Sequence, residues 1–392
     1  MDGMKPRERV IAALEHQDPD RVPLDLGGIN SSLMVQTYKN FIEYLDMPYE
    51  AVKLRSKVWQ TVQIPEPILE HFSIDTRYIF PDVVFESAGD SSKEEKEENN
   101  TTNKDDVFVD EWGVKREFIL HYYEIVEHPL KDANTVEDIE KYPWPDPKKF
   151  LVLDGLRKKA KHLHENTDYA IGGSIGGGII YELSWYLRGF TELLLDLQIN
   201  KDFIHALYSK IVEIRKETMD LFLGEVGEYL DFFQIGDDLA LQNTVLMQPE
   251  LYREMIKPYQ ANVIEFIKER TKAKIYYHSC GAVSPMLNDL IEIGVDAINP
   301  VQVSAKNMDP KDLKQAYGDN ITFWGGIDSQ NILPKGTTDE VRAAVRDTID
   351  ELAPGGGYIL AGVHNLQPDV PPENIVAMYE EASQYGAHKK NK

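Results

Sequence analysis

The chain has 392 residues, 42% of them hydrophobic, which is enough for a sizeable buried core. Its 42 Lys and Arg residues stand against 66 Asp and Glu residues, and the resulting formal net charge of −24 disfavours nucleic acid and anionic membrane surfaces as partners. No apolar run approaches the roughly 20 residues of a membrane span, and the charged N-terminus has no apolar signal core, so we expect a cytoplasmic protein.

Short runs rich in β-branched and aromatic residues alternate with longer stretches of helical periodicity. This alternation is typical of parallel strands joined by crossover helices. We expect strands at residues 21–28, 76–80 (the weakest), 169–173, 229–236, 273–280, 295–301, 321–326 and 357–363. Eight strands in a chain of this length favour one (β/α)₈ barrel, preceded by an N-terminal helical extension, over an open doubly wound sheet.

One stretch interrupts this scheme. Residues 89–106 are rich in Ser, Lys, Glu, Asn and Thr without apolar periodicity, and we expect a mobile acidic loop. Residues 107–127 follow as an inserted hairpin that turns at Gly113 and covers one end of the barrel.

Two helix starts are marked later in the chain. Gln248-Pro249-Glu250 opens a helix that runs toward Lys257, and Thr337 with Glu340 has the spacing of a capping box. The second helix should end before Ala353.

Candidate metal ligands stand where two predicted strands end. His278 and Cys280, the only cysteine, are two residues apart, so in an extended chain both side chains leave the same face. His364 lies just past the last strand. The carboxyl ends of barrel strands form the catalytic rim, so these three side chains form a candidate metal site. Taken alone, the His-x-Cys pair would also fit a structural histidine beside a buried free thiol.

Carboxylates follow other strands at the same rim. Asp237 and Asp238 close strand 229–236, and two adjacent carboxylates are not buried without partners or a metal. Glu182 lies beyond the glycine-rich residues 172–178, which lack a phosphate-loop ending and suggest a close approach of backbone to a ligand. We assign catalytic roles to Asp237 and Glu182, with an N-cap role as the alternative for Asp238.

Aromatic and amide side chains near the rim are candidates for contacts with a small, flat substrate. The candidates are Asn30, Tyr181, Trp185, Tyr277, Gln302 and Asn365. For the aromatic residues, a place in the core is the alternative.

With these motifs in place, the chain resembles the uroporphyrinogen decarboxylase superfamily, and within it the zinc- and corrinoid-dependent methyltransferases. The resemblance extends over most of the chain and rests on residues 5–10, 20–23, 236–238, 249–259, 277–281, 325–328, 356–360 and 371–375. It implies a (β/α)₈ barrel that binds zinc (Zn) and acts with a corrinoid protein that carries cobalamin. Some members of the superfamily are dimers, so the resemblance allows a homodimer.

The chain departs from both branches of this superfamily. The decarboxylases carry an arginine-rich N-terminal segment, and residues 21–28 lack that pattern. The methyltransferases that act on coenzyme M have a second cysteine after the last strand, where this chain has His364. A neutral imidazole in place of a thiolate removes one negative charge around the zinc and makes the zinc a stronger Lewis acid, which suits a weak oxygen donor.

The resemblance therefore implies zinc-dependent methyl transfer between a small methoxylated compound, such as an aryl methyl ether, and the cobalt of a corrinoid protein. Zinc would be held by His278, Cys280 and His364, with Asp237, Glu182 or water as a fourth ligand. A metal-free decarboxylase and a non-catalytic barrel that binds a corrinoid partner are the alternatives.

Overall fold

The computed structural model describes residues 3–48, 51–84 and 106–388, so the predicted loop at 89–106 lies outside the described residues except for Asp106. A sheet of seven parallel strands forms the centre: β3 (Thr76–Ile79), β9 (Ala170–Gly173), β10 (Phe232–Gly236), β11 (Lys274–His278), β12 (Ala297–Asn299), β13 (Thr322–Ile327) and β14 (Tyr358–Gly362). Their spatial order is β14-β13-β12-β11-β10-β9-β3. These seven strands confirm the predicted ones to within a few residues.

The two edges of this sheet meet on one short segment. Leu24 forms a parallel bridge with Leu360 of β14, and its carbonyl oxygen accepts a hydrogen bond of 2.9 Å from the amide of Asp75, just before β3. The strand predicted at 21–28 is thus reduced to a single bridging residue, and Pro23 has no amide hydrogen to extend the pairing. Because both edges bond to the same segment, the sheet closes, which confirms the (β/α)₈ barrel and rules out the open sheet.

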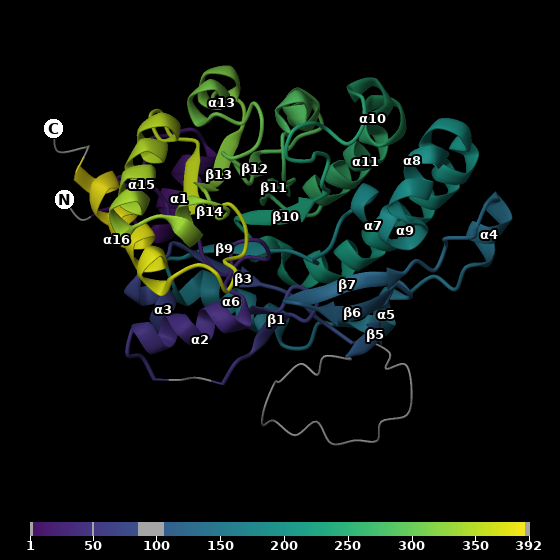
Figure 1. The fold of residues 1–392 in the computed structure, drawn as a ribbon. Helices are drawn as coiled ribbons and strands as arrows, with labels where there is room; N and C mark the ends of the chain where they lie inside the picture. Colours follow the sequence, from purple (N-terminus) through teal and green to yellow (C-terminus); the bar gives the residue numbers. More distant parts are fainter. Residues whose placement is uncertain (1–2, 49–50, 85–105, 389–392) are drawn as a thin grey trace.

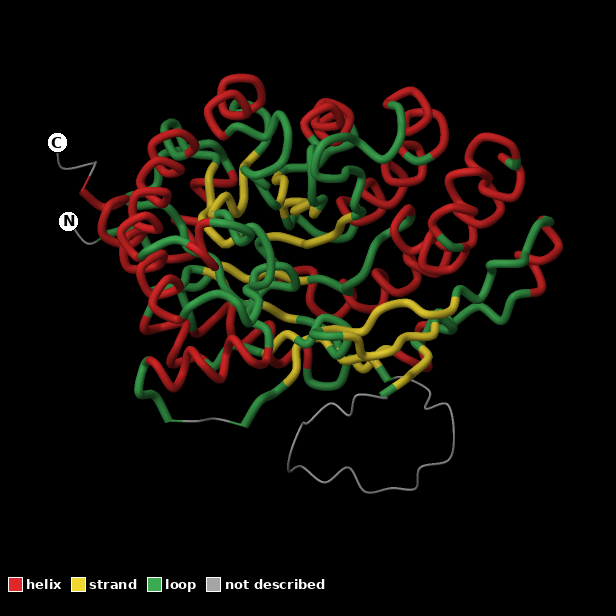
Figure 2. Tube along the Cα trace, viewed as in Figure 1, coloured by secondary structure: helices red, strands yellow, loops and turns green. Residues whose placement is uncertain are grey.

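Helices follow the strands and form a ring around them (Figures 1 and 2). Their bounds are α6 (Leu156–Asn166), α7 (Tyr181–Arg188), α8 (Phe190–Ile199), α9 (Lys201–Val226), α10 (Pro249–Met255), α11 (Lys257–Lys268), α12 (Leu287–Glu292), α13 (Pro310–Tyr317), α14 (Ile332–Lys335), α15 (Thr338–Leu352) and α16 (Pro372–His388). Both predicted helix starts are confirmed. Gln248 is the N-cap of α10, and Thr337 and Glu340 form a capping box at α15.

The N-terminal helix α1 (Pro6–Leu14) closes one end of the barrel. Val10 and Leu14 from α1 belong to the same buried cluster as Phe232, Tyr276 and Trp324 from three strands. Side chains therefore fill the barrel interior at this end, and a ligand site has room only at the carboxyl ends of the strands. None of the helices in the described ranges is long and apolar enough to cross a membrane.

Segments between the barrel strands add a second wall beside the barrel. Residues 107–127, predicted as one hairpin, form three antiparallel strands, β5 (Val107–Val109), β6 (Lys115–Ile119) and β7 (Tyr122–Glu127) (Figure 1). The smaller elements that precede β9 in the chain are α2 (Val35–Tyr44), β1 (Leu54–Ser56), β2 (Thr61–Val62), α3 (Glu66–His71), β4 (Asp82–Val83), α4 (Val136–Lys141), α5 (Pro147–Phe150) and β8 (Leu151–Val152). The amide of Tyr123 in β7 bonds to the carbonyl of Val58, which ties this sheet to the turn after β1.

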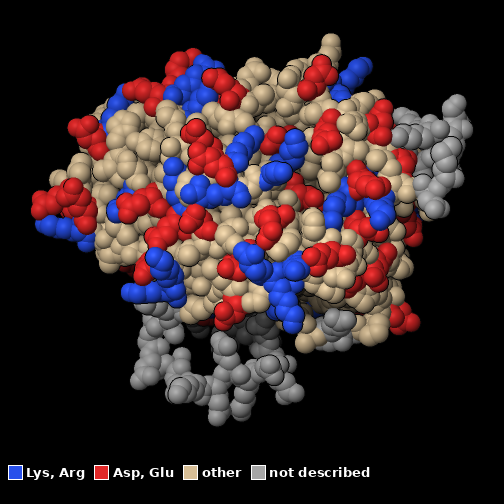
Figure 3. Space-filling model, turned by 180° about the vertical axis from the view of Figure 1, so that it is seen from behind, with Lys and Arg blue, Asp and Glu red and all other residues tan. Residues whose placement is uncertain are grey.

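The surface charge is mixed on the face turned away from the view of Figure 1. Figure 3 shows blue and red side chains interspersed there rather than separated into areas of one sign. Exposed pairs such as Arg157 with Glu225, at 3.2 Å, contribute little to stability because water screens their charges.

Candidate metal centre

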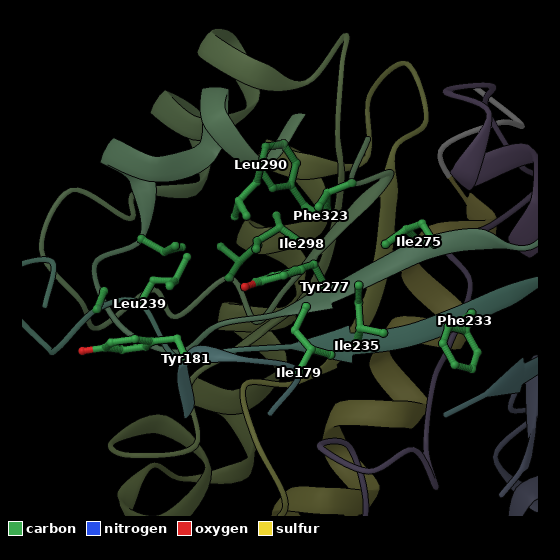
Figure 4. Close-up of a cluster of buried hydrophobic side chains, with 14 of the residues drawn as sticks. Ile179, Tyr181, Phe233, Ile235, Leu239, Ile275, Tyr277, Leu290, Ile298 and Phe323 are labelled. Atoms are coloured by element: carbon green, nitrogen blue, oxygen red, sulfur yellow. The ribbon is translucent and has the colours of Figure 1, made fainter. Parts of the chain in front are cut away.

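Successive residues of β10 and β11 face opposite sides of the barrel wall. Phe232 and Tyr276 lie in the interior cluster, whereas Phe233 and Tyr277 pack outside it, against the helices (Figure 4). His278 follows Tyr276 by two residues, so it faces the interior. The alternation thus assigns the histidine at the end of β11 to the inside of the barrel.

Glycines at two positions make room for this histidine and for the turn after it. Gly236 pairs with His278 in the register of β10 and β11, and a Cβ on it would lie 2.4 Å from the His278 carbonyl oxygen. Gly281 has φ +87°, and a Cβ there would lie 2.6 Å from the backbone oxygen of Leu241. Larger residues at either position would displace the segment from His278 to Cys280.

The three predicted metal ligands come together at the carboxyl ends of β11 and β14. One ligand atom from each of His278, Cys280 and His364 lies within 4.8 Å of the other two. Cys280 Sγ is 3.5 Å from His278 Nε2, and tetrahedral zinc with ordinary bond lengths would hold an S and an N about 3.6 Å apart. The separation of these two atoms therefore fits a shared zinc ion.

A neighbouring amide determines which nitrogen of His278 is free. Asn299 Oδ1 lies 2.6 Å from His278 Nδ1, and Asn299 Nδ2 donates to the carbonyl of Trp324 at 3.4 Å. In this orientation the amide oxygen accepts a hydrogen bond from the N–H group at Nδ1. The lone pair on Nε2 then points toward Cys280, as a metal ligand requires.

Burial keeps all three groups uncharged at neutral pH. It lowers the pKa of His278 to about 4 and that of His364 to about 4, so both imidazoles are neutral at pH 7. Burial, with the charges of Asp238 and Glu182, raises the pKa of the Cys280 thiol. A metal bound here would therefore displace a proton from Cys280.

The two adjacent aspartates have different surroundings from those predicted. Asp237 is fully buried, and its Oδ1 accepts hydrogen bonds from the amides of Ile180 and Glu182 at 3.1 and 3.0 Å, which caps the start of α7. Its Oδ2 accepts from Gln260 at 2.8 Å, and burial raises its pKa to about 6. These contacts speak against the catalytic role predicted for Asp237.

Asp238 is the carboxylate that faces the candidate ligands. Its Oδ1 lies 3.8 Å from His278 Nε2 and accepts a hydrogen bond of 2.8 Å from the amide of Cys280. It lines a cavity of about 80 Å³ together with His278 and His364. The N-cap role considered for Asp238 therefore belongs to its neighbour.

Glu182 lines the same small cavity. The hydroxyl of Tyr186 donates a hydrogen bond to its Oε1. Burial, followed by the charge of Asp238, raises the pKa of Glu182 to about 8. At neutral pH this carboxyl therefore keeps its proton and can donate it.

The aromatic residues predicted to contact substrate lie elsewhere. Tyr181 and Tyr277 are fully buried among apolar side chains between the barrel wall and the helices (Figure 4). The Tyr277 hydroxyl accepts a hydrogen bond of 2.7 Å from Gln260, and Trp185 packs edge-on against Tyr186. The position of both tyrosines behind the wall speaks against contact with substrate.

Among the predicted amides, only Asn30 lines the small cavity. Gln302 is buried and accepts a hydrogen bond of 2.7 Å from the amide of Gly281. Asn365 is also buried and accepts from the amide of Ser32 at 2.8 Å. These two amides hold the rim loops in place and have no exposed face toward the cavity.

Several residues at the site were not predicted. Trp59 lines the cavity and lies edge-on to the His364 ring, with the centroids 6.2 Å apart. Tyr186 contacts Glu182, and Asn299 contacts His278, as described above. Asn299 ends β12 and pairs with His278 of β11, so the strand register was a usable signal for it. Trp59 lies in an irregular loop, where no sequence pattern marks it.

Comparisons with known proteins agree on the family. The family model described as uroporphyrinogen decarboxylase (URO-D) matches residues 113–385. Uroporphyrinogen decarboxylase of Prochlorococcus marinus is 22% identical over 281 residues, which cover 68% of this chain and 74% of that protein. Methylcobamide:CoM methyltransferase MtaA of Methanosarcina barkeri is 26% identical over 212 residues, which cover 51% of this chain and 58% of that protein.

A solved structure has the same fold over nearly the whole length. A methyltransferase from Methanosarcina mazei covers 97% of this chain and 99% of its own, with a TM-score of 0.61 at 17% sequence identity. The family match extends over more than half of the sequence and includes β9 to β14. The chain therefore belongs to the uroporphyrinogen decarboxylase (URO-D) family.

Proposed function

We propose that this protein is a zinc-dependent methyltransferase that moves a methyl group between a small methoxylated compound, such as an aryl methyl ether, and the cobalt of a separate corrinoid protein. The observation that carries this proposal is the convergence of His278, Cys280 and His364 at the open end of the barrel. A relative named methylcobamide:CoM methyltransferase supports a corrinoid as the methyl-carrying partner.

The proposed ligands favour an oxygen compound as the methyl donor. One thiolate and two neutral imidazoles leave a divalent ion with one net positive charge, whereas a second thiolate would cancel it. An ether oxygen is a weak, neutral donor and needs the stronger Lewis acid. Zinc held by these three residues would supply that Lewis acidity to the ether oxygen.

The surrounding residues orient the ligands. Asn299 holds the proton on His278 Nδ1 and so keeps Nε2 available. Asp238 accepts the amide hydrogen of Cys280 and fixes the backbone that carries the thiol. Both contacts place the donor atoms before any ligand binds, which lowers the ordering cost of binding.

Glu182 has the properties of a proton donor for the oxygen that loses its methyl group. Tyr186 occupies Oε1, so the carboxyl proton resides on Oε2, and the raised pKa keeps it there at neutral pH. When the bond between the methyl carbon and oxygen breaks, the oxygen gains an electron pair, and a proton from Glu182 Oε2 would neutralise it.

Metal analysis followed by a methyl-donor panel tests the proposal. We expect about one zinc per chain, and formation of methylcobalamin from cob(I)alamin with methoxylated aromatics, measured by absorbance. His364→Ala should lose zinc and turnover together, whereas His162→Ala, on the exposed face of α6, should retain both. Turnover that survives complete removal of zinc would contradict the proposal.

The uroporphyrinogen decarboxylase activity is tested on the same preparation. The only arginine in residues 21–28, Arg21, already forms an ion pair of 2.7 Å with Asp75, just before β3. We expect no carbon dioxide release from a porphyrinogen. Release at a rate above that of methyl transfer would replace the proposed function with the decarboxylase.

A further inference from the structure

A larger cavity adjoins the small one that contains the candidate metal ligands. Its volume is about 450 Å³, within the range of roughly 300–1,000 Å³ that is usual for small-molecule sites. The two cavities share wall residues, among them Ile29, Trp59, Gly177 and Tyr186. A compound held in the larger cavity can therefore extend a substituent toward His364.

Aromatic rings form part of the wall of this larger cavity. Trp59 lies between the two cavities, edge-on to His364, and Trp112 and Tyr186 line the larger one. Trp112 is 3% exposed and is held by the antiparallel strands β5 and β6. Flat indole and phenol rings favour an aromatic ligand, because aromatic pairs gain about 0.5–1.5 kcal/mol beyond burial of area.

Arginines also line the larger cavity, and they differ in their partners. Arg116 is neutralised by Asp110 at 2.9 Å. Arg215 bonds only to the carbonyl oxygens of Gly176 and Gly178, and its Nε is buried without a partner among the described residues. The charge of Arg116 is therefore already balanced, whereas Arg215 has no carboxylate partner among the described residues.

Arg55 has even fewer contacts. Its guanidinium lies over the ring of Phe80, and within the described ranges no hydrogen bond or ion pair satisfies it; its Nε is buried. Asp82 attracts it electrostatically, but no ion pair within 4.0 Å forms. Burial lowers the pKa of Arg55, which reflects the cost of keeping a cation there. An anionic ligand would remove that cost.

We infer that the larger cavity binds the body of the methyl donor, and that the donor is an aromatic methyl ether with a carboxylate, held by Arg55 with help from Arg215. The ring would lie beside Trp59, with the methoxy group toward His278 and His364. This inference rests on the proposed function, which it narrows to methoxybenzoate-like compounds. Carboxylates and guanidinium groups match in shape as well as in charge.

Binding without cobalamin tests this inference separately from methyl transfer. The probes are meta-methoxybenzoate and its neutral isostere meta-methoxybenzamide, and the measurement is calorimetric titration of the zinc-loaded protein. We expect the acid to bind about 10- to 100-fold more tightly than the amide, as for a hydrogen bond to a charged group. Arg55→Met should abolish the preference, and Arg55→Lys should keep part of it.

Arg346→Met is the matched control, because Arg346 lies on α15 and pairs with Glu381 at 2.8 Å. It should keep the full preference. Equal affinity of the wild-type protein for acid and amide would overturn the inference even if no arginine variant folds. Retention of the full preference in Arg55→Met would also overturn it.

The two proposals fail in different ways. If the acid is preferred but no donor forms methylcobalamin, the anion site stands and the proposed function fails. If uncharged methoxybenzenes donate methyl groups and the acid shows no preference, the proposed function stands and the assignment of the cavity fails.

Discussion

Two clusters of polar side chains lie inside this barrel, and they differ in how fully they are hydrogen-bonded. Deep in the barrel, both oxygens of the buried Asp25 carboxylate are saturated: Thr76 and Tyr78 donate to Oδ1 at 2.5 and 2.8 Å, and Ser31 and Trp324 donate to Oδ2 at 2.7 and 2.9 Å. Burial still raises the pKa of Asp25, because four neutral donors do not fully replace water.

The cluster at the rim is unsaturated by comparison. In the described part of the chain, the hydrogen-bond contact of Cys280 Sγ is with His278 Nε2 at 3.5 Å, and the His364 ring contacts the rings of Trp59 and His278 without a hydrogen bond. Side-chain atoms that could bind a metal converge on one point beside a cavity here, with few hydrogen bonds among the described residues, which leaves them available to an external ligand. The saturated cluster stabilises the fold, and we propose that the unsaturated one binds the metal.

Loss of the thiol should have the largest effect. We expect Cys280→Ala to lower the zinc affinity by about a thousandfold or more, because the only anionic ligand is removed. The unfolding midpoint of the metal-free protein should change little, since no strong hydrogen bond is lost. A competition titration with a zinc chelator measures the affinity. An unchanged zinc affinity in Cys280→Ala would contradict the proposal that the rim cluster binds the metal.

The saturated cluster should respond in the opposite way. In Asp25→Asn, an amide NH₂ would face two donors, so we expect unfolding in urea to cost about 3 kcal/mol less than in the wild type. Zinc affinity per folded molecule should stay within about twofold. Asp347→Asn, on the exposed face of α15, is the control and should change stability by less than about 0.5 kcal/mol. If Asp25→Asn lost zinc without losing stability, the structural assignment would be wrong.

Asn299 connects the rim cluster to its support. We expect Asn299→Ala to lower zinc affinity by about 10- to 100-fold, because His278 would no longer be held in the tautomer with a free Nε2. Asn299→Asp retains an oxygen acceptor and should restore most of the affinity. The same chelator competition measures both variants. An equal loss in the two variants would show that packing, rather than the hydrogen bond, positions His278.

The smallest effect should come from Glu111, which borders the larger cavity. Burial and Asp110 raise its pKa to about 7, against the opposing charges of Arg215 and Arg116. The unfolded state therefore loses the proton first, so this group stabilises the fold below about pH 4.5 and its contribution is lost as the pH rises to 7.

Glu111→Gln stays neutral at every pH, so its stability relative to the wild type should rise by about 1 kcal/mol between pH 5 and pH 8, allowing for solvent screening. Urea unfolding at both pH values measures this difference. Glu124→Gln, on the exposed side of β7, should show no such pH dependence. A flat difference for Glu111→Gln would mean that its charge is compensated in the folded protein.

Local periodicity in the sequence carried more information than the predictions used. The period of two that placed His278 and Cys280 on one face also places Tyr277 on the other, against the helices. The same period of two, continued from β10, places Asp237 and Asp238 on opposite faces, with Asp237 toward α7 and Asp238 toward His278. For both Asp237 and Tyr277, the sequence therefore contained a local signal for the position that the structure gives them.

The sequence alone determined the seven regular strands, the common face of His278 and Cys280, and the resemblance to the family, because all of these depend on neighbouring residues and short motifs. Only the tertiary structure decided that His364 lies beside His278 and Cys280. It also decided that Asp237, which follows β10, caps α7, which follows β9, and that Leu24 closes the barrel by a single bridge. These contacts depend on how distant strands are arranged around the barrel, and side-chain periodicity does not encode that distance.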